Sequence, residues 1–150
     1  MQDNESNTAK SSGGHSFNQQ LNKLMSQLLT ENKIDNFRKE PRYNYPSKKQ
    51  KQFSPDGEIT LLDGRIIIYD NTTTVRHDRL KQKLWDAYGI KEHFKSQDIL
   101  IQYYVVVPDE MIEKEVKNFL REKAKLNNSE YYSTIDDIIT IRELLKIIVN

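Results

Sequence analysis

The chain has 150 residues, with 23 Lys and Arg against 22 Asp and Glu, so its net charge of +1 favours no class of partner. It contains no cysteine, which excludes disulfides and cysteine-type zinc sites. No stretch approaches the roughly 18 apolar residues of a membrane-spanning helix, and the polar N-terminus lacks the apolar region of a signal peptide. We therefore expect a soluble, cytoplasmic protein that does not bind membranes.

The charges are unevenly distributed along the chain. The stretch from Arg38 to Lys51 carries six basic residues against the single acid Glu40, and Arg76 to Lys95 adds six more. Acidic residues become frequent only from Asp109 onward. A basic first half suits a polyanionic partner such as nucleic acid.

The N-terminal segment divides at His15. Residues 1–15 are rich in Asn, Ser, Gly and Gln, so they bury too little apolar surface to order, and we predict a disordered leader. Ser16 suits an N-cap, and apolar residues at helical spacing then predict an amphipathic helix over residues 17–32. We expect residues 16–150 to form one domain.

The stretch 34–52 is basic and aromatic. Pro41 and Pro46 argue against a helix, and a short extended piece is predicted around Arg42 to Tyr45. Basic residues that alternate with tyrosines, including Lys48 and Lys49, suit phosphate contact and base stacking. The alternative is a solvated loop whose tyrosines pack on the domain.

A β-hairpin follows. The β-prone runs EITLL and RIIIY are joined by Asp63-Gly64, which is the strongest local hairpin signal. Asp56 stands just before the first strand, and Asp70 ends the second. In a hairpin that turns at 63–64, residues whose numbers sum to about 127 face each other, so we expect the two carboxylates to meet. Mg²⁺ needs only one or two carboxylates; the alternative is that both aspartates are turn residues.

The rest of the chain alternates helices and strands. Val75 to Phe94 is predicted as a helix, with Trp85 on its core face. The near-continuous apolar run Ile99 to Val107 is typical of a strand buried on both faces. A helix over residues 109–126, a short strand at Asp137 to Thr140 and a last helix at Ile141 to Ile148 complete an α/β domain with a central mixed sheet flanked by helices.

At the hairpin the sequence resembles the PD-(D/E)xK nucleases, the fold of most type II restriction endonucleases. Pro55-Asp56 matches the first part of that motif, and Asp70-Asn71-Thr72 stands where Asp or Glu, any residue and Lys are expected. The element order over roughly residues 17–107 is similar to the αβββαβ core of the family, with the piece near Arg42 to Tyr45 as its first strand. The resemblance implies a restriction-endonuclease-like core.

Thr72 is a departure from this pattern, because the family has lysine there. The following helix offers Arg76, Lys81 and Lys83 as replacements, and we keep both Lys81 and Lys83 as catalytic candidates. Without such a replacement the resemblance implies a weak or inactive site.

The resemblance implies a Mg²⁺-dependent endonuclease that acts on double-stranded DNA, often as a homodimer. Asp56 and Asp70 would hold the metal with the carbonyl of Asn71, and Glu31 or Glu40 would add a third carboxylate. The predicted DNA contacts are Thr72, Thr73, Arg76, Arg79, Lys48 and Lys49. The alternatives are a catalytically inactive module of the same fold that binds nucleic acid or a protein partner, and a structural α/β domain with no nucleic-acid role.

Overall fold

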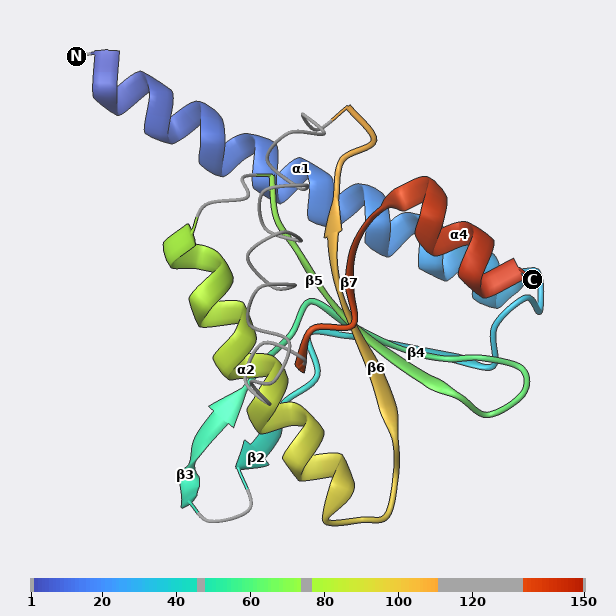
Figure 1. Cartoon of the computed structure of the whole chain (residues 1–150). Coiled ribbons are helices and arrows are strands. Elements are labelled where there is room, and N and C mark those ends of the chain that lie inside the picture. Colours follow the sequence, from blue (N-terminus) through green and yellow to red (C-terminus); the bar gives the residue numbers. More distant parts are fainter. Residues whose placement is uncertain (1, 46–47, 74–76, 111–133, 150) are drawn as a thin grey trace.

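A computed structural model describes residues 2–45, 48–73, 77–110 and 134–149, and within these it describes the side chains of 16–44, 53–73, 82–110 and 134–149. The architecture is α/β, with a five-stranded mixed sheet in the order β1-β4-β5-β6-β7 (Figure 1). The first three of these strands are antiparallel, and β5, β6 and β7 are parallel. Their bounds are β1 Asn36–Lys39, β4 Gly57–Thr60, β5 Ile66–Asn71, β6 Ile101–Val107 and β7 Asp137–Thr140.

Helices cover both faces of the sheet, as predicted for this class. The helices α1 (Gln2–Thr30) and α4 (Ile141–Val149) lie on one face, and α2 (His77–Lys95) lies on the other (Figure 1). A second, two-stranded sheet of β2 (Tyr43–Tyr45) and β3 (Lys48–Phe53) packs beside α2. Within the described ranges, no helix is both long and apolar enough to cross a membrane.

The alternation of side chains along the strands produces two separate cores. On the α1 side, Leu21 and Met25 pack with Ile67, and on the α2 side Leu84 packs with Ile68. The strand β6 is buried on both faces, as its apolar run predicted, because α2 covers one side and α1 with α4 covers the other.

The β4–β5 hairpin forms at the predicted turn. Gly64 has φ 90°, a left-handed conformation that favours glycine over other residues. Gly57 pairs with Tyr69, which brings the preceding Asp56 alongside Asp70. Close approach also requires glycine at position 57, since a Cβ there would lie 2.3 Å from Cζ of the Tyr69 ring.

Two predictions about the first half of the chain differ from the structure. The helix α1 begins at Gln2, so the segment predicted as a disordered leader belongs to a helix; extending a helix that is already anchored costs less than starting one. The first strand of the central sheet is β1, and the piece predicted as a strand near Arg42 to Tyr45 contributes to β2 of the second sheet instead. Glu40 has φ 45° and Pro41 follows it, so the chain turns out of the central sheet there.

The prediction that Trp85 lies on the core face of its helix is wrong, because 48% of the residue is exposed. The core stripe of α2 is formed by Leu84, Ala87 and Ile90, which leaves the neighbouring Trp85 to stack on Tyr88 at a centroid distance of 6.2 Å. The strand β7 and the helix α4 lie where they were predicted, and the Thr140 hydroxyl accepts the Glu143 N–H as an N-cap does. The helix predicted over residues 109–126 falls almost wholly outside the described residues.

Candidate active site

Asp56 and Asp70 meet at the end of the β4–β5 hairpin, as the pairing register predicted. The Asn71 N–H donates to Asp56 Oδ2 at 2.7 Å, and the Asp56 N–H donates to Asp70 Oδ1 at 3.2 Å. Each carboxylate therefore accepts a backbone hydrogen bond from the other strand. This exchange fixes the two side chains next to each other.

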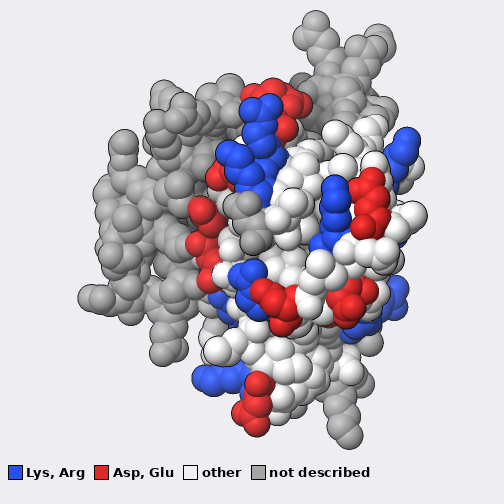
Figure 2. Space-filling view, turned by 90° about the vertical axis from the view of Figure 1, so that its right-hand side faces the viewer, with Lys and Arg blue, Asp and Glu red and all other residues white. Residues whose placement is uncertain are grey.

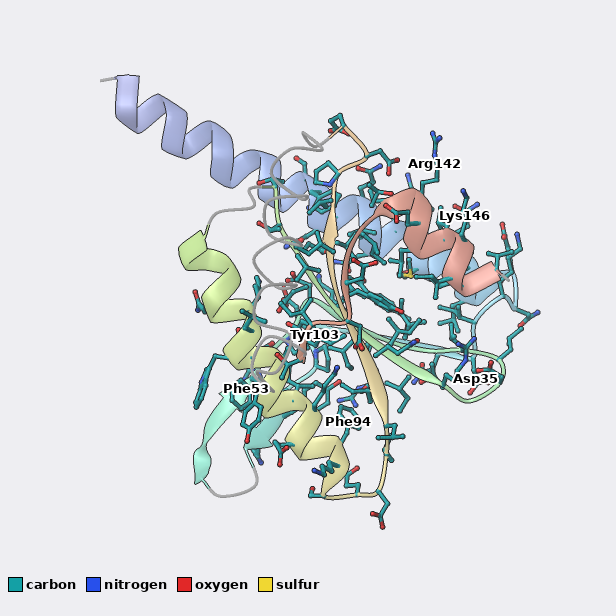
Figure 3. All side chains as sticks on the ribbon, viewed as in Figure 1. Asp35, Phe53, Phe94, Tyr103, Arg142 and Lys146 are labelled. Atoms are coloured by element: carbon teal, nitrogen blue, oxygen red, sulfur yellow. The ribbon has the colours of Figure 1, made fainter. Side chains whose placement is uncertain are left out.

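Side chains from two further elements converge on Asp70, which is only 4% exposed. The Tyr103 hydroxyl on the parallel neighbour β6 donates to Asp70 Oδ2. Lys83 on α2 places its Nζ 3.4 Å from Asp70 Oδ1, with 22% of the lysine side chain exposed. Figure 3 shows Tyr103 in the layer between α2 and the central sheet. The site thus joins two antiparallel strands, a parallel strand and a helix.

The site holds more negative than positive charge. Burial raises the pKa of Asp56 to about 6, and the charge of Asp70 adds to this effect, whereas the Asn71 N–H and Lys83 oppose it. Burial and then the charge of Asp70 also raise the pKa of Asp86 on α2 to about 6. Lys83 lowers the pKa of both Asp56 and Asp86. An additional cation would therefore be stabilised there.

The donor set suits Mg²⁺, which binds oxygen ligands and retains several waters when only one or two carboxylates hold it. Asp56 and Asp70 supply such a pair. The predicted third carboxylate is not found, since no three His, Asp or Glu side chains in the described part of the chain are grouped to hold a metal ion. Glu31 pairs with Lys33 at 3.2 Å near the other end of the hairpin, and Glu40 is exposed.

Of the two catalytic lysine candidates, the structure brings Lys83 to the aspartates. Lys81 also lies in α2, but its side chain is outside the described set. Thr72 is buried, and its N–H donates to the Val106 carbonyl at 3.0 Å. A buried side chain does not suit the DNA contact that we predicted for Thr72, because DNA meets the protein surface.

The other predicted DNA contacts are only partly described. Thr73 is half-buried and is the second residue after the end of β5. Arg79 lies in α2, and Lys48 and Lys49 lie in β3, each with its backbone described but not its side chain. Arg76 falls outside the described residues.

Comparison of the chain with models of known protein families, with curated proteins and with solved structures found no match. The geometry of the site is therefore the basis for a function. Sequence reasoning missed two members of this site, Tyr103 and Asp86. Asp86 lies three residues after Lys83, so helical spacing puts both on one face and could have indicated it. Nothing in the run ILIQYYVVV distinguishes Tyr103 from its neighbours.

A second polar network supports β4, the strand that follows Asp56. Glu58, two residues further along β4, is buried with 7% of its surface exposed. It accepts a hydrogen bond from the Tyr43 hydroxyl at 2.5 Å and pairs with Arg38 at 3.5 Å. On the other face, the Asn71 side-chain amide donates to Asn18 of α1 at 2.8 Å. These contacts fix the ends of β4 and β5 to the second sheet and to α1.

Proposed function

We propose that the protein is a Mg²⁺-dependent DNA endonuclease that hydrolyses phosphodiester bonds in double-stranded DNA. The observation that carries this proposal is the convergence of Asp56, Asp70 and Lys83 at the end of the β4–β5 hairpin. Two carboxylates and a lysine that come from different elements, around a partly buried point, are a common arrangement for metal-assisted phosphoryl chemistry.

The topology supports the same proposal. The elements α1, β1, β4, β5, α2 and β6 give the order αβββαβ, with β5 parallel to β6. This order resembles the PD-(D/E)xK core, with the β2–β3 sheet inserted after the first strand. Asp56 then occupies the position of the first acid of the motif, and Asp70 that of the second.

The side chains divide the chemistry among them. Asp56 and Asp70 would hold Mg²⁺ with the Asn71 carbonyl, and the bound metal would supply Lewis-acid stabilisation of the scissile phosphate and acidify a water molecule. Thr72 cannot fill the role of the motif lysine, and Lys83 takes this role. The ammonium of Lys83 lies beside Asp70, and its side chain is partly exposed, so that a phosphate could reach it. Tyr103 orients the carboxylate of Asp70 through its hydroxyl.

An inactive module of the same fold, which binds nucleic acid or a protein partner, is the second candidate. The contacts of Asp70 favour the inactive module, since Tyr103 and Lys83 already engage both carboxylate oxygens of Asp70. In that case Lys83 only compensates the charge of the two aspartates.

Cleavage of supercoiled plasmid, measured together with DNA binding, distinguishes the endonuclease from the inactive module. The wild-type protein is incubated with plasmid in Mg²⁺ and in EDTA, and binding to a labelled duplex is measured in parallel. The endonuclease predicts nicking or linearisation that needs Mg²⁺ and is lost in Lys83→Gln. Lys91→Gln is the matched control, because Lys91 lies on the same helix and pairs with Asp136 at 2.9 Å. DNA binding without Mg²⁺-dependent cleavage would instead support the module.

A further inference from the structure

The second sheet is a two-stranded ribbon that the chain inserts between β1 and β4. In this β2–β3 ribbon, Tyr43 pairs with Phe53 at the root, and the register shifts between Asn44 and Tyr45. Figure 1 shows the ribbon beside α2 and away from the central sheet. Of the ribbon side chains that the structure describes, Tyr43 and Phe53 at the root belong to the core on the α2 side.

The root of the ribbon is fixed firmly to α2. Phe53 lies directly over Gly89, where a Cβ would come within 2.3 Å of the Phe53 ring. Tyr43 packs against the rings of Phe94 and His93 at centroid distances of 5.1 and 5.2 Å. Figure 3 shows Phe53 and Phe94 beside the same helix. Packing of this kind holds the direction in which the ribbon leaves the domain.

The root is also connected to the candidate active site. The Tyr43 hydroxyl donates to Glu58 on β4, two residues after Asp56 in the chain. Phe53 precedes Asp56 by only three residues in the chain. The position of the ribbon is therefore set relative to the aspartates.

The ribbon is basic, whereas other parts of the surface are mixed. Residues 43–53 include Lys48, Lys49 and Lys51 and no acidic residue. Figure 2 shows acidic and basic side chains interspersed on a different face of the molecule, where neither sign prevails. Three lysines without an acidic residue in a two-stranded ribbon complement the phosphates of a duplex, whose major groove admits such a ribbon.

We propose that the β2–β3 ribbon is a DNA-binding arm that contacts the phosphate backbone of duplex DNA and holds it next to Asp56 and Asp70. This inference rests on the proposed function for the identity of the partner, but it concerns binding rather than cleavage. The lysines act as point charges on phosphates, so the arm supplies affinity and position rather than base specificity.

The test is the affinity of the full chain for a fluorescently labelled duplex, measured by anisotropy at several salt concentrations in EDTA, so that no metal-dependent cleavage occurs. The test variant combines Lys48→Gln, Lys49→Gln and Lys51→Gln. The matched control combines Lys33→Gln, Arg65→Gln and Lys146→Gln, which removes the same charge from exposed positions elsewhere. Thermal denaturation establishes that both variants are folded.

The ribbon variant should bind the duplex at least about tenfold more weakly than the control. The slope of the logarithm of the binding constant against the logarithm of the salt concentration should be shallower by about 0.9 for each phosphate that the arm no longer neutralises. Equal affinity and equal salt dependence of the two variants would overturn the proposal, as would wild-type protein that binds no duplex. Stronger binding to single-stranded DNA or RNA than to duplex would overturn the commitment to duplex DNA. Ribbon-dependent binding without cleavage in Mg²⁺ would uphold the arm and refute the endonuclease.

Discussion

Replacement of Asp56 by asparagine should stabilise the protein at neutral pH, although Asp56 belongs to the candidate active site. The carboxylate of Asp56 lies next to that of Asp70 in a partly buried position. Asparagine has nearly the same shape, and its side-chain oxygen can still accept the Asn71 N–H that Asp56 Oδ2 accepts at 2.7 Å. The substitution therefore removes the charge and keeps the geometry.

The size and sign of the effect follow from the pKa. Burial and the charge of Asp70 raise the pKa of Asp56 from 3.8 to about 6. Each unit corresponds to about 1.4 kcal/mol, so ionisation of Asp56 costs the folded state at most about 3 kcal/mol. Because the folded pKa is above the unfolded one, the cost is absent below pH ~4, grows as the pH rises towards 6 and is complete above it.

The assay is urea denaturation followed by circular dichroism, at several pH values from 4 to 8 in EDTA. Relative to wild type, Asp56→Asn should gain free energy of unfolding as the pH rises from 4 to 8. Asp63→Asn is the control, since Asp63 is exposed and the backbone N–H and side chain of Arg65 hold its pKa below the usual value. A stability difference between Asp56→Asn and wild type that is the same at pH 4 and pH 8 would refute the reasoning.

Three further substitutions test the hydrogen bond of Tyr103, the charge of Lys83 and the contact between Gly89 and Phe53. Tyr103→Phe should lower the free energy of unfolding by about 1–3 kcal/mol, since it removes the hydrogen bond that the Tyr103 hydroxyl donates to the buried Asp70 Oδ2. An unchanged denaturation midpoint would contradict this. Lys83→Gln should destabilise the protein more at pH 8 than at pH 4, because Lys83 compensates carboxylates that are charged at pH 8. Added Mg²⁺ should recover more stability in this variant than in wild type, and a loss of stability that is independent of pH would argue against charge compensation. Gly89→Ala should lower the free energy of unfolding by about 1–3 kcal/mol, because the new methyl group overlaps the Phe53 ring, and it should weaken duplex binding. Normal stability and affinity would show that the root of the ribbon is not fixed.

Local signals in the sequence predicted the central part of the fold and half of the site. The Asp63-Gly64 turn set the pairing register of the hairpin, and that register alone brings Asp56 to Asp70. The apolar run of β6 predicted a strand buried on both sides for a similar reason, since its composition excludes a solvent face.

The features that were missed depend on contacts between distant segments. The strand β1 carries only Phe37 as an apolar residue, so it is a strand because the edge of β4 pairs with it. The contact of Lys83 with Asp70 depends on the rotation of α2 relative to the sheet, which no residue of the helix determines alone. Tyr103 reaches Asp70 only because β6 lies beside β5 in parallel, a pairing between segments more than 30 residues apart.

The role of Asp70 in a metal-dependent endonuclease is tested by the cleavage of supercoiled plasmid in Mg²⁺ by Asp70→Asn, compared with Asp63→Asn and wild type at equal concentrations. Asp70 is the residue on which Asp56, Lys83 and Tyr103 converge, whereas Asp63 lies in the exposed turn of the same hairpin. A Mg²⁺-dependent endonuclease with its metal on Asp70 should cleave the plasmid as wild type and as Asp63→Asn, and should not cleave it as Asp70→Asn. Cleavage by Asp70→Asn at the wild-type rate would contradict it.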